Sequence, residues 1–151
     1  MSNHDLFFLL EQFLNYGIVG ILIFMSFLVV WLFIERILFY KNIKFDNYLH
    51  RDSLELDLTN NLSIISVVGS NAPYVGLLGT VIGIMLTFYS MGDVDTIDAK
   101  QIMLGLALSL KATAMGLLVA IPATISYTIS LRKVERILTQ YDILQDTTNN
   151  G

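Results

Sequence analysis

The chain has 151 residues, of which 54% are apolar and only 15% carry a charge. A water-soluble domain carries roughly 25% charged residues, so this composition indicates a protein that lies in a lipid bilayer. The net charge of −4 argues against nucleic-acid binding, and the absence of cysteine excludes disulfides, cysteine-ligated zinc and thiol nucleophiles.

The first segment, residues 1–15, places apolar side chains at helical spacing and has no Lys or Arg. It predicts either an amphipathic helix on the outer, periplasmic membrane surface or a simple extension of the span that follows. A secretory signal peptide needs a positive start and a small-residue cleavage site, so we expect this segment to be retained.

The first apolar run is Gly17–Ile34, and it ends at the charged pair Glu35 and Arg36. Its length matches the roughly 20 residues that a helix needs to cross about 30 Å of hydrocarbon. We therefore predict a first transmembrane helix at 16–35.

Two further apolar runs follow, and only short polar pieces separate them, so no second domain is expected. We predict a cytoplasmic segment with an approach helix at 36–72, a second span at 73–92 that starts at Pro73, a short periplasmic loop at 93–101, a third span at 102–131 and a cytoplasmic tail at 132–151.

The basic residues beside these spans fix the orientation. Seven lie between spans one and two or after span three, whereas Lys100 alone lies between spans two and three. The chain is therefore predicted to be an all-α membrane protein with three transmembrane helices, its N-terminus outside and its C-terminus inside.

Spans two and three carry stripes of small and hydroxyl residues at spacings of three, four and seven, which place them on one helix face. Such stripes either pack helices closely or form a polar seam or pore. The candidate pore-lining residues are Thr80, Thr87, Ser109 and Thr113. The candidate packing residues are Gly76, Gly79, Gly83, Ala112, Gly116 and Ala120, together with Pro73 and Pro122.

No Asp, Glu or His lies in span two or span three. A proton path across a membrane needs a titratable group, usually a carboxylate or an imidazole, and a hydroxyl cannot hold a proton as a stable charge. If this chain conducts protons, a partner must supply the carboxylate.

One charge, Lys111, lies within span three. It either extends its ammonium to the outer membrane surface or pairs with an acid on a neighbouring helix. Glu35 and Arg36 are expected to form an ion pair at the inner membrane surface, where anchoring is favoured over chemistry.

The stretch from Ala72 to Phe88 (APYVGLLGTVIGIMLTF) and the stretch from Leu110 to Tyr127 (LKATAMGLLVAIPATISY) together resemble the paired signature of the ExbB/TolQ/MotA proton-channel family. The resemblance is closest to the ExbB and TolQ branches and covers roughly Gly69 to Leu131. Two long motifs in the same order form a specific signal.

The resemblance implies a homo-oligomer, a pentamer, in the bacterial inner membrane, whose spans two and three surround a central pore. An ExbD dimer would place single helices in this pore and supply an aspartate, and TonB would pass the work to outer-membrane transporters. The family's two pore-facing threonines correspond to Thr80 and Thr113, and Pro73 and Pro122 match family prolines.

The chain departs from the family pattern in two residues. Leu108 stands where many relatives have a glutamate, and Lys111 stands where an apolar residue is usual. The cytoplasmic segment between spans one and two is also short. A TolQ-type subunit of an envelope system and a non-conducting scaffold are the alternatives. No cofactor or metal set and no nucleophile–base pair appear in the sequence, so an enzyme is not expected.

Overall fold

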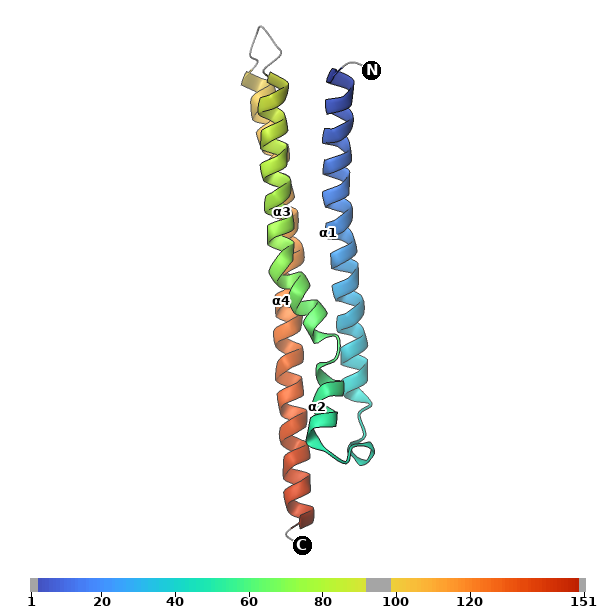
Figure 1. Cartoon of the computed structure of the whole chain (residues 1–151). Coiled ribbons are helices and arrows are strands. Elements are labelled where there is room, and N and C mark those ends of the chain that lie inside the picture. The colour runs from blue at the N-terminus through green and yellow to red at the C-terminus, as the bar shows by residue number, and fades with distance from the viewer. Residues whose placement is uncertain (1–2, 92–98, 150–151) are drawn as a thin grey trace.

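The computed structural model describes residues 3–91 and 99–149, and in this part of the chain every regular element is a helix. Figure 1 shows a long, narrow bundle with the N-terminus at one end and the C-terminus at the other. The elements are α1 (Asn3–Lys41), the short 3-10 helix η1 (Phe45–Asn47), α2 (Arg51–Thr59), α3 (Leu62–Met91) and α4 (Ala99–Asn149).

Three stretches of these helices are long and apolar enough to cross a membrane: Tyr16–Lys41, Arg51–Tyr89 and Ile102–Thr148. The predicted fold class, an all-α membrane protein with three spanning helices, is confirmed. Large apolar side chains point outward along the bundle, among them Phe24 and Trp31, each 64% exposed. Lipid is the solvent in which such a surface is stable.

The helices are longer than the predicted spans. Residues 3–41 form one continuous helix, so the described part of the predicted first segment, 3–15, continues into the first span rather than forming a separate helix. α3 begins at Leu62 and runs through Pro73, where we predicted the second span to start. The predicted periplasmic loop falls mostly on residues 92–98, which lie outside the described part of the chain. The membrane boundaries themselves stay predictions.

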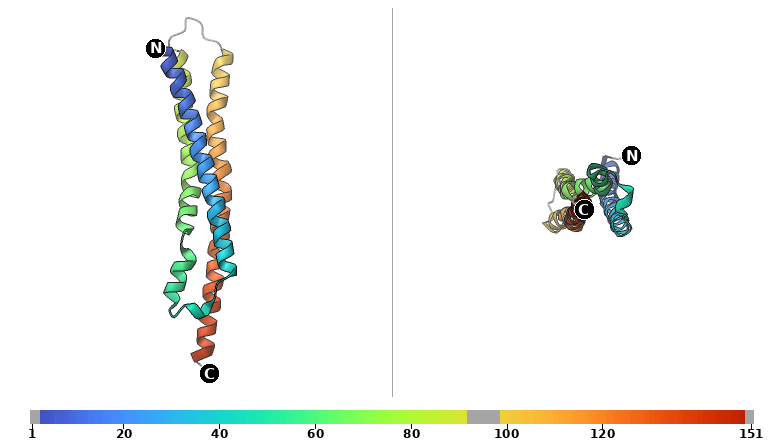
Figure 2. Two further views of the ribbon diagram at one scale, coloured as in Figure 1. Left: turned by 90° about the vertical axis from the view of Figure 1, so that its right-hand side faces the viewer. Right: turned by 90° about the horizontal axis from the view of Figure 1, so that it is seen from below.

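Two apolar clusters hold the bundle together. The upper cluster joins α1, α3 and α4 through buried residues such as Leu22, Ile65 and Ala123. The lower one joins the end of α1 to α2 and to the long extension of α4 through Leu54, Leu58, Val134 and Leu138, among others. α3 and α4 lie antiparallel and side by side, with α1 beside them (Figure 2).

Candidate functional site

α3 and α4 come into backbone contact where two glycines face each other. A Cβ atom on Gly76 would lie 2.7 Å from the carbonyl oxygen of Ala112, and a Cβ atom on Gly116 would lie 2.6 Å from that of Ala72. Real side chains do not approach a backbone oxygen so closely, so only glycine fits at either position. Close approach of this kind drives helix association in lipid.

The two threonines of the predicted site meet one helical turn along α3 from this crossing. Thr80 Oγ1 lies 2.5 Å from Thr113 Oγ1, 3.0 Å from the carbonyl oxygen of Ser109 and 3.3 Å from that of Gly76. Thr80 is only 7% exposed, whereas Thr113 is half-buried. The hydroxyl pair is therefore reached from outside the protomer through Thr113.

The hydroxyl pair has a definite hydrogen-bonding capacity. Each hydroxyl has one proton to donate and two lone pairs that can accept. Within the pair one hydroxyl donates to the other, and the second proton is directed at a backbone carbonyl. Free lone pairs can accept a bond from water or a protonated carboxyl, and a proton becomes available to a carboxylate when the carbonyl bond opens. The pair can relay or solvate a proton, but it cannot hold one as a charge.

The other two pore-lining candidates bond within their own helices. Thr87 Oγ1 donates to the carbonyl of Gly83 at 2.8 Å, and Ser109 Oγ donates to that of Gly105 at 2.8 Å. Across the interface between α3 and α4, Ser109 packs against Gly83 and Thr87 packs against Gly105, since a Cβ atom on either glycine would meet the facing side chain. In the protomer these residues pack α3 against α4, and a pore-lining role for them stays a prediction.

The remaining packing candidates divide between the interior and the surface. Gly79 lies between Ala112 and Ile18 of α1, since a Cβ atom there would come within 2.7 Å of one and 3.1 Å of the other. Ala120 is buried. Pro73 is half-buried and Pro122 is exposed, both inside continuous helices.

Lys111 lies on the exposed side of α4, about 160° around the helix from Ser109. Among the residues that the structure describes, it has no acidic partner within ion-pair distance. Leu108, the first of the two departures from the expected family pattern, is 49% exposed. No group of three potential metal ligands occurs in residues 3–91 and 99–149.

Arg36 is the best-buried charged residue that the structure describes, at 5% exposure. Its Nη2 lies 2.7 Å from Glu35 Oε1, its Nη1 donates to the carbonyl of Asp57 at 3.0 Å, and its guanidinium lies 4.9 Å from the ring centre of Phe39. The predicted pair with Glu35 is present in the protomer, and the same guanidinium also ties α1 to α2.

Replacing Arg36 by alanine is expected to destabilise the bundle by about 2 kcal/mol. A hydrogen bond from a charged group, such as the one to the Asp57 carbonyl, contributes about 1.5–3 kcal/mol, whereas the ion pair with Glu35 adds little because Glu35 is half-exposed. Thermal unfolding in detergent, followed by circular dichroism, measures the change. Lys41→Ala is the control, since Lys41 is exposed at the end of the same helix. Equal midpoints for the two variants would contradict the role assigned to Arg36.

Sequence reasoning missed two features at the beginning of α3, several helical turns from the threonine pair. Asn61 joins α2 to α3 with a φ of 63°, a left-handed conformation that asparagine tolerates better than most residues. The Asn60–Asn61 doublet was the available signal. Gly69 was also missed: a Cβ atom there would lie 3.0 Å from Thr124 Oγ1, so the close contact of α3 with α4 continues below the crossing.

Comparison with known proteins identifies the family to which these packed helices belong. The model of the MotA/TolQ/ExbB proton channel family matches residues 34–143, which is most of the chain and includes both threonines. The chain belongs to this family. Its members are proton-channel subunits, and the hydroxyl seam lies inside the matched region.

Several relatives match this family member over nearly their whole length. A Helicobacter pylori protein named biopolymer transport protein ExbB-like 2 is 51% identical over 134 residues, which cover 89% of each chain. The biopolymer transport protein ExbB of Aquifex aeolicus is 50% identical over 135 residues, 89% of this chain and 91% of its own. A second Helicobacter pylori protein, named ExbB, is 48% identical over 137 residues, 91% and 94% of the two chains.

Proposed function

We propose that this chain is the stator subunit of a proton-driven motor in the bacterial inner membrane, which couples the proton motive force to TonB-dependent transport across the outer membrane. The observation that carries the proposal is the Thr80–Thr113 hydroxyl pair, placed between two helices whose predicted spans, 73–92 and 102–131, contain no carboxylate. Such a seam suits proton transfer to and from an acid that another polypeptide supplies.

The partner in this proposal is an ExbD-like protein with a single span that contains an aspartate. Homo-oligomers of this chain, pentamers in the family pattern, would surround the partner helices. Thr113 is the member of the pair that the partner's carboxylate would meet first, because Thr80 lies behind it. The proposed proton transfer needs neither a catalytic residue nor a cofactor in this chain.

The relatives favour a TonB-linked role over the sibling Tol-Pal role. Three ExbB-named relatives match over about nine tenths of their own length. By contrast, the Tol-Pal system protein TolQ of Pseudomonas aeruginosa is 39% identical over 92 residues, which cover only 40% of its chain. This chain thus shares its short length with these three ExbB-named proteins, whereas the longer ExbB of Pseudomonas putida is matched over only 24% of its own length.

The decisive experiment is proton flux into liposomes. The purified chain alone, the chain with an ExbD-like partner, and the chain with a partner whose membrane aspartate is replaced by asparagine are compared with a pH-sensitive dye under an applied gradient. We expect flux only in the second preparation. A stable complex without flux would instead support a non-conducting scaffold, and equal flux without the partner would contradict the need for an external carboxylate.

A further inference from the structure

At the level of the lower apolar cluster, the side of α4 that faces away from the cluster is basic and has no partner in the described part of the chain. A groove of about 500 Å³ is lined there by Arg132, Glu135, Arg136, Thr139 and Gln140. It continues towards the membrane as an apolar groove of about 230 Å³ walled by Ile125 and Ile129, among others. Neither arginine lies within ion-pair distance of an acid in the part of the chain that the structure describes.

This face points away from the rest of the protomer. Val134 and Leu138 are the buried residues of α4 at this level, and Arg136 lies about 160° around the helix from each. Nothing in the described protomer covers the groove, although its arginines stand beside apolar surface.

α2 has an outward face of the opposite charge. Leu54 and Leu58 bury one side of this helix, and Leu56, on the other side, is 72% exposed. Asp52 and Asp57 flank Leu56 and are both exposed. Asp57 accepts a hydrogen bond from the hydroxyl of Tyr48 at 2.9 Å, but neither aspartate has a basic partner in the described residues.

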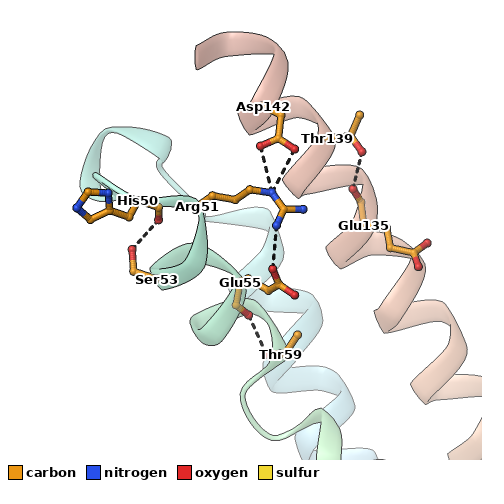
Figure 3. A network of polar contacts seen from close by, with 8 residues as sticks. All are labelled: His50, Arg51, Ser53, Glu55, Thr59, Glu135, Thr139 and Asp142. Atoms are coloured by element: carbon orange, nitrogen blue, oxygen red, sulfur yellow. Dashed lines mark hydrogen bonds and ion pairs between the residues drawn. The ribbon is translucent and has the colours of Figure 1, made fainter. Parts of the chain in front are cut away.

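The basic residue of α2 cannot neutralise these aspartates, because Arg51 is already committed. Its guanidinium lies 3.1 Å from Glu55 and 3.2 Å from Asp142 of α4 (Figure 3). The protomer thus presents an acidic, partly apolar face on α2 and a basic, partly apolar face on α4, on opposite flanks.

The two faces lie at matching heights. Three contacts show one constant register, in which each step forward along α2 and α3 is one step back along α4: Arg51 with Asp142, Gly69 with Thr124, and Thr80 with Thr113. In this register Asp57 lies level with Arg136, and Ser53 lies level with Gln140.

Membrane insertion limits how copies can meet. All copies share one orientation and depth, so any symmetry axis stands along the membrane normal, and residues of equal height face each other. A two-fold contact would set arginines against arginines or aspartates against aspartates. A head-to-tail contact sets arginines against aspartates, and head-to-tail contacts close into rings.

We propose that the α4 face of one copy packs against the α2 face of the next copy, with Arg136 paired to the neighbour's Asp57. This inference rests on the homo-oligomer of the proposed function and assigns its contact surfaces. The neighbour's Leu56 lies level with residue 137 of α4 and is covered in the same contact.

Cysteine cross-linking tests the geometry, because the natural chain has no cysteine. Ser53→Cys and Gln140→Cys are made singly and together, and membranes are oxidised before electrophoresis. We expect each single variant to stay uncross-linked and the double variant to give a ladder of dimers, trimers and larger species. Dimers from either single variant would show a two-fold contact and overturn the proposal.

Charge exchange tests the pair itself. Asp57→Arg and Arg136→Asp, each combined with the two cysteines, are expected to reduce the ladder at least fivefold, and the double exchange is expected to restore it. Failure of the double exchange to restore it overturns the pairing. An oligomer that retains partner-dependent proton flux but gives no ladder overturns this interface and leaves the proposed function standing, whereas a monomeric chain without flux overturns both.

Discussion

Replacing Thr80 and Thr113 together by valine is expected to abolish partner-dependent proton flux and TonB-dependent uptake while the chain still inserts and assembles. Valine keeps the shape of threonine, so the seam stays filled, but both hydroxyls that contact each other at 2.5 Å are gone. Flux through liposomes and growth on a TonB-dependent nutrient measure the two effects. We expect a loss of at least 100-fold.

Magnitudes separate this functional loss from simple destabilisation. A hydrogen bond between membrane helices contributes about 0.6 kcal/mol on average and about 1.7 kcal/mol at most, whereas a 100-fold loss corresponds to about 2.7 kcal/mol in a rate barrier. Serine at both positions is expected to restore much of the flux, since it returns the hydroxyls.

Thr128→Val supplies the matched control. Thr128 is exposed, and its hydroxyl donates to the carbonyl of Thr124 at 2.9 Å, so its removal takes a similar bond from α4 outside the seam. Flux that falls equally in this control, or that survives in the double valine variant, would contradict a specific role for the Thr80–Thr113 pair.

The sequence was sufficient for the fold class because the bilayer imposes a simple length rule. The uncharged run from Gly17 to Ile34 could be interpreted as a span from its length alone. Helix limits were harder. α3 runs through Pro73 because its packing against α4, through Gly76 and Gly79, outweighs the local cost of proline. The sequence of α3 alone does not reveal this contact with α4.

The sequence predicted which face of each helix carries the hydroxyl residues, but not which of these residues contact each other. Helical spacing placed Thr80 and Thr87 on one side of α3, yet only the register against α4 decides that Thr80 meets another hydroxyl while Thr87 bonds to its own helix. The burial of Arg36 could not be predicted from the sequence pattern either, because it depends on α2 folding back beside α1, where the Asp57 carbonyl accepts a hydrogen bond from Arg36.

Substituting Gly116 by alanine is expected to destabilise the bundle by about 2 kcal/mol and to lower proton flux, because the new methyl group would overlap the Ala72 carbonyl and force α3 and α4 apart. The Thr80–Thr113 contact lies one turn from the crossing, so the same displacement weakens it. Thermal unfolding in detergent and flux in liposomes measure the two consequences.

Gly20→Ala is the control with the opposite expected sign. A Cβ atom at Gly20 would meet nothing within 4 Å, so alanine there brings only its better helix propensity, up to about 1 kcal/mol in favour of the fold. An unfolding midpoint that falls as far in this variant as in Gly116→Ala would show that the crossing has no special sensitivity.

The double substitution distinguishes a shared crossing from two local clashes. A Cβ atom on Gly76 would lie 3.1 Å from Gly116 Cα, and a Cβ atom on Gly116 would lie 3.0 Å from Gly76 Cα, so both methyl groups would enter one gap. Once the first alanine has separated the helices, the second meets less resistance. We therefore expect Gly76→Ala with Gly116→Ala to cost at least 0.5 kcal/mol less than the two single changes together. Strict additivity would mean that each glycine relieves a separate contact, and it would contradict a single shared crossing of α3 and α4 at this point.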